Sequence, residues 1–364
     1  MKIIHSADQH LDSKMEANLT REKAKERNIE VRNTFVRMIE RASEEGVDAI
    51  LLAGDLFDRK VVSRTDQEVV KNAIMTHPDI EFFYIRGNHD DNSFLASLED
   101  APDNLKLFTD KFTSYQVKDS DVIVTGAELT GGNSQGVYNT LNLDMDKFNI
   151  VMLHGQESGY EGKDKTEIIN LSMLKNKGID YLALGHIHEH KEDQLDARGY
   201  YAYSGCLEGR GFDECGDHGY IILDIDEKTH EYTHEFIPCA YRKLHIVNVD
   251  ITDLETITDI EDKVRETFTE ADISDRDMIK VELTGAVTMD TNIDLDYLTK
   301  IFADVFYTIK FKNRTNIKID YDAYAMDESL KGEFVRKVKA SDLSEDEKAD
   351  IIKLGIGLLQ GEKI

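Results

Sequence analysis

The sequence predicts an α/β protein that contains more than one domain. Short apolar strand patterns alternate with helical patterns from residue 2 to residue 88, which is typical of a layered α/β domain. The chain has 364 residues, which is long for a single hydrophobic core. A second strand and helix alternation begins after Pro238. These observations together predict two or three domains.

The first domain is predicted to cover residues 1–240. Its longest predicted helix covers residues 21–46, where Phe35, Met38 and Ile39 lie near helical spacing and Gly46 provides a stop. A second helix is predicted over residues 65–77. Strands are predicted over residues 2–8, 47–55, 80–88, 121–129, 148–155, 180–188, 199–205 and 218–226.

A smaller α/β domain is predicted over residues 241–327, followed by a helical tail over residues 328–364. In the tail, Ser344 and Glu347 have the spacing of a capping box before an apolar run. The smaller domain has predicted helices over residues 254–271 and 294–306, and predicted strands over residues 244–251, 278–287, 307–313 and 316–324.

The composition narrows the class of protein. No apolar run approaches the roughly 20 residues that cross a bilayer, and the chain opens without a charged leader before an apolar stretch. The three cysteines match neither a zinc ribbon nor a redox pair, so reduced thiols and a cytoplasmic location are expected. The net charge of −28 repels nucleic acid at long range and argues against a simple basic-groove DNA binder.

Polar residues follow five of the predicted strands at the point where each strand ends. Ligands of α/β sheets bind at the carboxyl ends of the strands, so these side chains are expected to meet. Each motif alone is typical of a surface turn, whereas all of them in this order indicate a binding site. The residues are Asp8 and His10, Asp55 and Asp58, Asn88 and His89, His154, and His186 and His188.

Seven of these residues form a candidate ligand set for two metal ions. In an extended chain Asp8 and His10 point to one side, and the same holds for His186 and His188. Seven ligands exceed the needs of one tetrahedral zinc, but they suit two ions about 3.5 Å apart that share a carboxylate. Imidazole, carboxylate and amide ligands without a thiolate favour manganese, iron or zinc over calcium.

The segments DQH, GDLFD, GNHD, LHG and GHIH resemble the five motifs of the calcineurin-like metallophosphoesterases, over roughly the first 240 residues. The resemblance implies a two-layer β-sandwich that is flanked by helices and holds a dinuclear metal centre. Asp55 would bridge the two ions. Carried over by motif, one ion would take Asp8, His10 and His188, and the other would take Asn88, His154 and His186.

The same resemblance implies catalytic roles for His89 and Asp58. His89 would lie beside the scissile phosphate, where it would stabilise phosphate charge or protonate the departing oxygen. Asp58 resembles the carboxylate that pairs with this histidine in many members of the family. Two cations would lower the pKa of a water for in-line attack on phosphorus.

Three features resemble the SbcD-like branch of DNA repair nucleases: the second α/β domain as a capping domain, the segment YSGCLEGRGFDE, and the helical tail. This branch implies a manganese-dependent DNA exonuclease or endonuclease, with iron, zinc or magnesium as other candidate metals. It also implies an SbcC-type coiled-coil ATPase that docks on the tail and offsets the acidic charge, and a homodimer for which residues 65–77 are one candidate. Arg210 either touches a phosphate or pairs with Asp213 or Glu214.

Two alternatives stay open at this point. The same fold also serves phosphodiesterases and phosphatases that act on nucleotides or other small molecules, with the second domain closing over the substrate. A scaffold without activity, which binds DNA ends or regulates an ATPase, is the other alternative. The complete ligand set and the presence of His89 argue against this scaffold.

Overall fold

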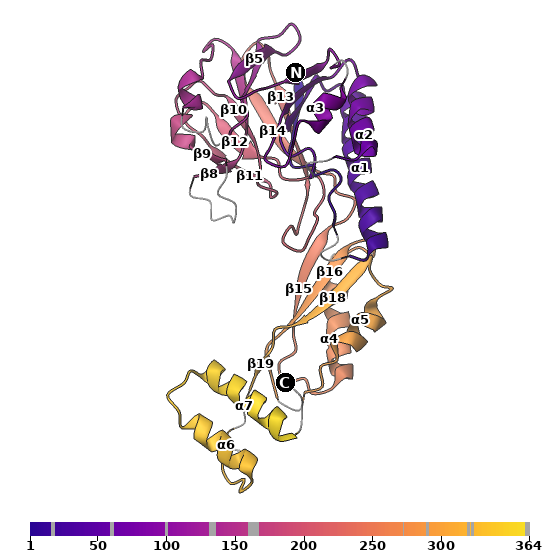
Figure 1. Cartoon of the computed structure of the whole chain (residues 1–364), viewed down its shortest axis with the longest axis vertical. Helices are drawn as coiled ribbons and strands as arrows, with labels where there is room; N and C mark the ends of the chain where they lie inside the picture. Colours follow the sequence, from indigo (N-terminus) through magenta and orange to yellow (C-terminus); the bar gives the residue numbers. More distant parts are fainter. Residues whose placement is uncertain are drawn as a thin grey trace. The chain divides into compact units, whose positions relative to one another are not determined.

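The computed structural model describes residues 1–15, 19–58, 62–98, 101–130, 136–158, 167–271, 273–288, 291–318, 321 and 324–360. The chain divides into two compact units, Met1–Lys243 and Leu244–Ile364 (Figure 1). The helical tail is grouped with the second unit, and its separation as a third domain stays a prediction.

The first unit contains a six-stranded sheet with the order β14-β13-β1-β2-β3-β4. Its four consecutive strands β1, β2, β3 and β4 are parallel, and β13 and β14 extend the sheet in antiparallel pairing. The carboxyl ends of the parallel strands therefore lie along one edge. The strands are β1 (Lys2–Ser6), β2 (Ala49–Ala53), β3 (Glu81–Ile85), β4 (Leu105–Leu107), β13 (Gly219–Ile225) and β14 (Tyr232–Pro238).

A second six-stranded sheet has the order β11-β12-β10-β7-β6-β5. Its four central strands are parallel, and the two edge strands pair in antiparallel fashion. These strands are β5 (Thr113–Gln116), β6 (Val122–Gly126), β7 (Phe148–His154), β10 (Tyr181–Gly185), β11 (Lys191–Gln194) and β12 (Tyr200–Tyr203). A two-stranded sheet joins β8 (Gln156–Glu157) to β9 (Ile168–Ile169).

The two faces of the first sheet belong to two different cores. Along β2, Leu51 is buried in a cluster shared with the second sheet, whereas Leu52 is buried in a cluster shared with helices. This alternation follows the two-residue period of a strand. The helices of this layer are α1 (Arg21–Glu44), α2 (Arg64–Met75) and α3 (Ser93–Ser97).

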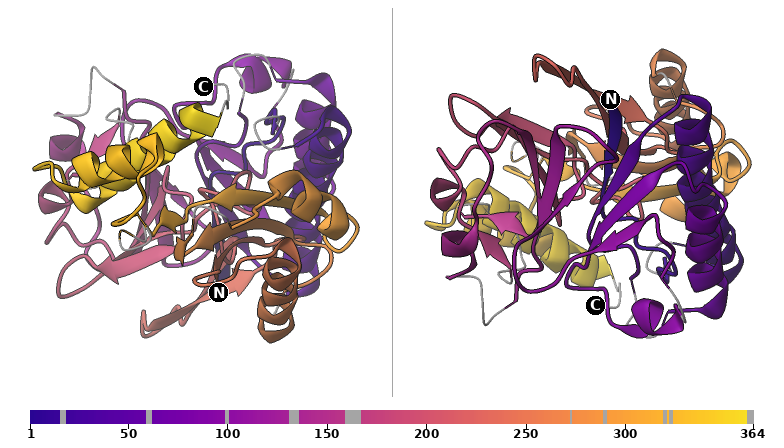
Figure 2. Two further views of the ribbon diagram at one scale, coloured as in Figure 1. Left: turned by 90° about the horizontal axis from the view of Figure 1, so that it is seen from below. Right: turned by 90° about the horizontal axis from the view of Figure 1, so that it is seen from above.

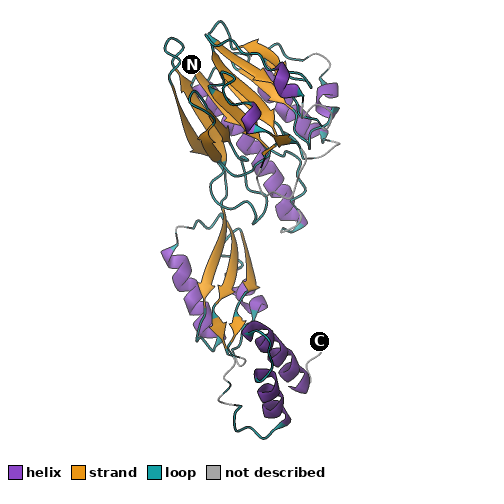
Figure 3. Cartoon of the chain, turned by 90° about the vertical axis from the view of Figure 1, so that its left-hand side faces the viewer, coloured by secondary structure: helices purple, strands orange, loops and turns teal. Residues whose placement is uncertain are grey.

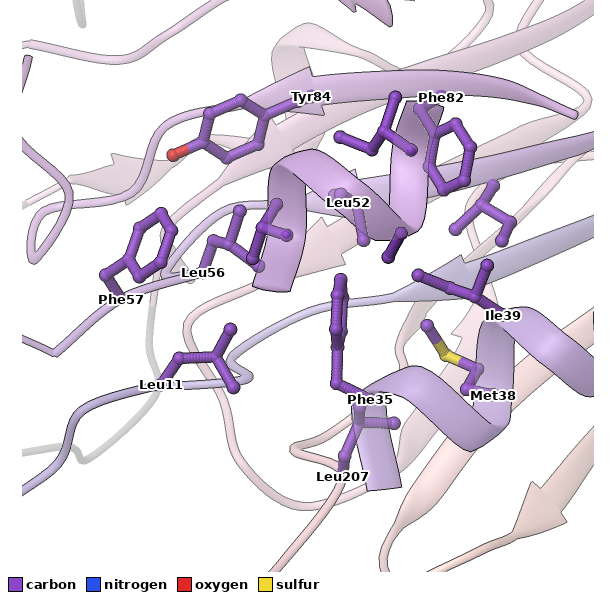
Figure 4. Packing of buried hydrophobic residues seen from close by; sticks show 14 of the residues in the cluster. Leu11, Phe35, Met38, Ile39, Leu52, Leu56, Phe57, Phe82, Tyr84 and Leu207 are labelled. Carbon is purple, nitrogen blue, oxygen red and sulfur yellow. The ribbon is translucent and has the colours of Figure 1, made fainter. Parts of the chain in front are cut away.

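The helix α1 covers one face of the first sheet, and Figure 2 shows this helix, in indigo, along one side of the strands. Phe35, Met38 and Ile39 of α1 point toward Leu52 and Phe82 of the sheet (Figure 4). Their spacing of three and four residues is that of one buried helix stripe. The predicted helix over residues 21–46 is therefore confirmed, and it ends two residues earlier at Glu44.

The outer face of the second sheet forms a third core. Leu153, Leu182 and Leu184 of this sheet pack with Tyr138 and Leu141. The covering layer contains the short helices η1 (Val137–Thr140) and η2 (Leu171–Met173). Two sheets that share a core and carry helices on their outer faces confirm the predicted two-layer β-sandwich flanked by helices.

The second unit contains a parallel sheet with the order β15-β16-β18 and two helices beside it (Figure 3). Its own core includes Val281, Leu298 and Phe302. Of the strand predicted over residues 316–324, only Asn316–Ile317 is a strand, and residues 319, 320, 322 and 323 lie outside the described residues. The elements are β15 (Leu244–Asp250), α4 (Ile257–Glu270), β16 (Met278–Thr284), β17 (Ala286–Val287), α5 (Leu295–Phe302), β18 (Thr308–Asn313) and β19 (Asn316–Ile317).

The tail forms two helices, α6 (Leu330–Lys339) and α7 (Glu345–Gln360). Val335 of α6 packs against Ile352 and Ile356 of α7. The predicted capping box is confirmed, because Ser344 N donates to Glu347 Oε2 at 2.9 Å and Glu347 N donates to Ser344 Oγ at 3.3 Å. Among the described residues, no helix is both long and apolar enough to span a membrane.

Candidate metal centre

All seven predicted metal ligands lie at the carboxyl ends of parallel strands in the first unit. Asp8 and His10 follow β1, Asp55 follows β2, Asn88 follows β3, His154 ends β7, and His186 and His188 follow β10. The two sheets of the sandwich therefore contribute ligands to the same place. The chain segments that meet here are far apart in sequence, and the strands bring them together.

The backbone at these residues is not extended, so the extended-chain explanation for the Asp8 and His10 pair was wrong. Asp8 has φ +53° and His10 has φ +46°, and Asp55 and His186 have φ of +51° and +101°. Non-glycine residues adopt this left-handed region rarely, and it concentrates at functional sites. His186 and His188 lie with different groups of ligands.

The first group consists of Asp8, His10 and His188, whose ligand atoms all lie within 4.8 Å of one another. The Nε2 atoms of His10 and His188 are 3.1 Å apart. Two nitrogens that bind one metal at about 2.1 Å and at right angles to each other would be about 3 Å apart. Both oxygens of Asp8 accept the backbone N–H of His186 at 2.9 Å, which fixes this carboxylate.

The second group surrounds the Asn88 side chain. Its Oδ1 lies 3.3 Å from His154 Nε2 and 3.1 Å from His186 Nδ1. The other nitrogen of His154, Nδ1, donates to the carbonyl oxygen of Ala53 at 2.9 Å. A proton on Nδ1 leaves the lone pair of Nε2 directed at the group, as a metal ligand requires.

Asp55 lies between the two groups. Its Oδ2 is 3.4 Å from His154 Nε2 and 3.7 Å from His10 Nε2. Its Oδ1 accepts the backbone N–H of His89 at 2.9 Å. One carboxylate thus reaches both groups, as the bridging role predicted for Asp55 requires.

Burial and mutual proximity shift the pKa values of these groups. Burial raises the pKa of Asp8 to about 6, although His188 and His154 oppose this rise. Burial would lower the pKa of His154, but the carboxylate of Asp55 outweighs this effect and raises it to about 10. Burial would also raise the pKa of Asp55, but His154 holds it well below the usual range. Negative charge at Asp55 therefore meets positive charge at His154.

The predicted catalytic pair, His89 and Asp58, lies beside the first group. Asp58 Oδ1 is 3.7 Å from His89 Nδ1, but only 3.1 Å from His10 Nδ1. The side chain of His89 is 44% exposed, so this ring is open to a substrate. Asp58 lies closer to a predicted metal ligand than to the histidine with which it was expected to pair.

Two charged residues that were not among the predicted site residues lie near the ligands. Asp90 accepts backbone N–H groups from Gly87, Leu56 and Phe57 at 2.9–3.2 Å, which ties the turn after β3 to the turn after β2. Burial and then the charge of Asp55 raise the pKa of Asp90 to about 7. In the sequence, Asp90 could have been recognised as a candidate site residue because it directly follows His89 in the GNHD segment.

Arg210 is the second of these residues. Its guanidinium lies between Glu214 and Asp58, with Nη2 2.9 Å from Glu214 Oε1 and Nη1 3.1 Å from Asp58 Oδ1. Of the two sequence-level alternatives for Arg210, the structure shows the pairing with Glu214. The pairing with Asp58 joins residues 152 positions apart and had no signal in the sequence.

The residues present fit a pair of divalent cations. Two imidazole Nε2 atoms at 3.1 Å, a carboxylate between the two groups and an amide oxygen form a convergent set of electron-pair donors. Nitrogen and oxygen donors without sulfur suit manganese, iron and zinc. The fit supports the predicted ligand set.

Comparison with known proteins gives a family match. Residues 1–190 match the model of the calcineurin-like phosphoesterases. An uncharacterized metallophosphoesterase of Bacillus subtilis, YhaO, is 31% identical over 289 residues, which cover 74% of this chain and 67% of that protein. The DNA double-strand break repair protein Mre11 of Sulfolobus acidocaldarius is 24% identical over 349 residues, covering 89% of this chain and 88% of that protein.

Similar solved structures include the protein TT1561 of Thermus thermophilus, with a TM-score of 0.40 and 13% identity over 65% of this chain and 98% of that one. A dimetal phosphatase from Danio rerio has a TM-score of 0.40 and 9% identity over 61% of this chain and 92% of that one.

The family match covers the strands that carry all five motifs, from Asp8 to His188. The sandwich fold and the two groups of ligands at its strand ends agree with this match, because proteins of this fold bind two divalent metals. The chain therefore belongs to the calcineurin-like phosphoesterases, a family of metal-dependent phosphoester hydrolases.

Proposed function

We propose that this chain is the nuclease subunit of an SbcD-like complex and hydrolyses DNA phosphodiester bonds with two manganese ions. The observation that carries the proposal is the extent of the similarity to the Mre11 repair protein. That match covers 89% of the chain, so it cannot be contained in the first unit, Met1–Lys243, and continues into the second. Similarity that extends beyond the phosphoesterase domain favours this branch over other members of the family.

In this proposal each metal ligand is assigned to one of the two ions, and Asp55 is assigned to both. Asp8, His10 and His188 would hold one ion, Asn88, His154 and His186 would hold the other, and Asp55 would contact both. When bound, the two cations polarise the phosphoryl group and lower the pKa of a water. His154 and His188 keep a lone pair toward the ions because the Nδ1 of each contacts a carbonyl or carboxylate oxygen.

His89 has the position of a catalytic acid. Its backbone N–H is anchored on Asp55 Oδ1 at 2.9 Å, while its side chain remains exposed. The ring centroid lies 5.0 Å from that of His10, so the His89 ring borders the first group of ligands. A histidine in this place can donate a proton to the departing oxygen of a phosphodiester.

The proposal includes a partner. On α7, Leu354, Leu358 and Leu359 are about half exposed, while Ile352 and Ile356 are buried against α6. The exposed leucines support docking of an SbcC-type coiled-coil ATPase on this helix. Such a partner would supply the basic surface that a chain with a net charge of −28 lacks for DNA.

The predicted homodimer has less support from the described residues than the docking of a partner on α7 has. Val70 and Ile74 of α2, the candidate dimer helix, are buried in the core of their own unit. Only Met75 of its apolar residues is notably exposed, at 54%. The dimer therefore stays a prediction.

The net charge favours one competing function, hydrolysis of a small phosphodiester, because a small substrate is repelled less than DNA. The test is hydrolysis of linear double-stranded DNA, single-stranded DNA and a small chromogenic diester by the purified full chain with manganese. Chelator, His89→Ala and the off-site variant His77→Ala are the controls.

DNA cleavage should depend on manganese, should be abolished by chelator and should be preserved in His77→Ala. His89→Ala should keep both metal ions and lose about 10²- to 10⁴-fold in rate, the usual contribution of a general acid. Loss of metal together with activity would make His89 a ligand instead. Cleavage of the small diester alone, even with an ATPase partner present, would replace the nuclease proposal with the small-molecule one.

A further inference from the structure

Three charged side chains lie behind the ligands Asp8, His10 and His188. Arg210 Nη1 donates to Asp58 Oδ1 at 3.1 Å, and Arg210 Nη2 donates to Glu214 Oε1 at 2.9 Å. One planar guanidinium therefore joins two carboxylates, a geometry that arginine provides and lysine does not. We call Asp58, Arg210 and Glu214 the positioning triad.

One carboxylate of the triad contacts a metal ligand directly. Glu214 Oε1 lies 2.7 Å from His188 Nδ1. Since an ionised carboxylate only accepts hydrogen bonds, the shared proton is on Nδ1. Arg210 Nη2 lies 3.0 Å from the same nitrogen. A guanidinium can only donate hydrogen bonds, and Nδ1 already carries a proton, so these two nitrogens are in contact without a hydrogen bond. The lone pair of His188 is then on Nε2.

The other carboxylate lies beside the second imidazole. Asp58 Oδ1 is 3.1 Å from His10 Nδ1. Among the described residues His10 Nδ1 has no hydrogen-bond partner, so the charge of the nearby Asp58 carboxylate is what favours a proton on this nitrogen. The Nε2 atoms of His10 and His188 then face each other at 3.1 Å. Each imidazole thus has a carboxylate at Nδ1 and directs Nε2 toward the same point.

The second group of ligands is supported differently. His154 Nδ1 contacts the backbone carbonyl of Ala53 at 2.9 Å instead of a carboxylate. An imidazole binds a metal more strongly when its other nitrogen donates to a carboxylate than when that nitrogen donates to a neutral carbonyl. His188 and His154, one from each group, therefore differ in the charge that lies beside Nδ1.

Arg210 is held in place by its own loop. Glu214 Oε2 accepts the backbone N–H of Arg210 at 2.8 Å, and Gly211 O accepts the backbone N–H of Glu214 at 2.8 Å. The side chain of Arg210 is 19% exposed, and two carboxylates balance its charge. This environment suits the positioning of neighbouring side chains better than the binding of a phosphate from solvent.

We propose that the positioning triad sets the tautomer and orientation of His10 and His188, and that it thereby determines metal affinity at the position these histidines share with Asp8. Asp58 would then be a positioning residue for His10, in addition to its predicted place beside His89. The inference rests on the two-metal centre of the proposed function. It does not depend on which phosphoester is cut.

The test is titration of the chelator-treated full chain with Mn²⁺ by isothermal calorimetry. Glu214→Gln keeps the size of the side chain and removes its charge. Arg210→Lys keeps the charge and removes the planar fork. The matched control is Asp213→Asn, which changes an exposed carboxylate in the same loop.

The wild-type chain should bind two ions. Glu214→Gln and Arg210→Lys should each weaken one of the two binding events by about 10- to 100-fold and leave the other unchanged, as loss of an outer partner does at other metal sites. Asp213→Asn should bind both ions as the wild type does. Thermal unfolding without metal checks that each variant is folded.

Two results would overturn the proposal. In the first, both triad variants bind two ions with wild-type affinity. In the second, both events weaken equally, as expected when a substitution disturbs the whole unit. A wild-type chain that binds two ions but leaves DNA intact would contradict the nuclease proposal and leave the triad standing.

Discussion

Asp55 is the side chain that links the two groups of metal ligands. Its Oδ2 lies within 3.7 Å of an imidazole nitrogen from each group, on His10 and on His154. Asp55→Ala should therefore lose both ions, which metal analysis after dialysis would measure. The control is Asp79→Ala, an exposed aspartate before β3, which should retain two ions. An Asp55→Ala chain that still held two ions would refute the bridging role.

His5 is a buried histidine outside the ligand set. Its Nε2 donates to the carbonyl of Leu184 at 3.1 Å, and its Nδ1 accepts from the Tyr181 hydroxyl at 2.9 Å, so it joins β1 to β10. Burial lowers the pKa of His5 to about 3. His5 therefore has a structural role.

The lowered pKa predicts acid sensitivity. Between about pH 6.5 and pH 3 the unfolded chain binds a proton at this residue and the folded chain does not, so the free energy of unfolding falls as the pH falls. The loss from this one group is about 1.4 kcal/mol per pH unit. In His5→Gln this component should be absent, and stability should therefore decline less steeply from pH 6 to pH 4.

Urea unfolding in chelator at several pH values would measure this difference. The control is His77→Gln, since His77 is only half-buried at the end of α2, and its pH profile should follow that of the wild type. Parallel profiles for His5→Gln and the wild type would show that His5 titrates normally in the folded chain.

At the scale of elements, the ends of β2 and β10 approach each other closely. A Cβ atom at Gly185 would lie 2.0 Å from the carbonyl oxygen of Ala53 and 2.8 Å from His154 Nδ1. Only a glycine lets the two sheets meet at this point, where His186 follows directly in the chain. The backbone of Ala53 cannot yield without disturbing β2.

Gly185→Ala should therefore separate the two strand ends. The expected loss is about 1–3 kcal/mol in the free energy of unfolding, the usual cost of overpacking, together with weaker Mn²⁺ binding because His154 and His186 shift. Urea unfolding in chelator and Mn²⁺ titration would measure the two effects. Gly136→Ala is the control, since a Cβ there meets no described atom within 4 Å. Wild-type stability and affinity in Gly185→Ala would contradict the close approach.

At the scale of the whole molecule, the two units have separate cores. The core of the second unit is built around Phe302, which is 1% exposed and whose ring lies 5.6 Å from that of Phe268 and 5.8 Å from that of Phe311. The metal ligands all belong to the first unit. Stability of the second unit and metal affinity of the first are therefore expected to change independently.

Phe302→Ala should lower the stability of the second unit by about 3–5 kcal/mol, because it removes a large buried side chain. Calorimetry should show one thermal transition shifted downward, while Mn²⁺ affinity stays at the wild-type value. Tyr297→Ala, at an exposed position of the same helix, should change stability by only about 0.5 kcal/mol. A fall in Mn²⁺ affinity in Phe302→Ala would show that the two units are coupled.

Much of the fold and of the candidate site could be predicted from the sequence. The helix over residues 21–46 and the strands of the first domain were predicted because the period of apolar residues is a local property of the chain. The ligand candidates from Asp8 to His188 could be named because each follows an apolar strand. Parallel strands then require that their ends meet.

The tertiary structure alone decided how these residues are arranged. The left-handed backbone at Asp8 and His10 depends on contacts with the neighbouring strand ends, such as the Asp8 N–H to Gly54 O hydrogen bond at 3.0 Å. The approach of Arg210 to Asp58 joins residues 152 positions apart, and no local pattern carries such a distance. Residue type and spacing determined which side chains form the site, because both are properties of the sequence itself. Packing of the two sheets determined which side chains touch, because contacts between distant segments exist only in the folded chain.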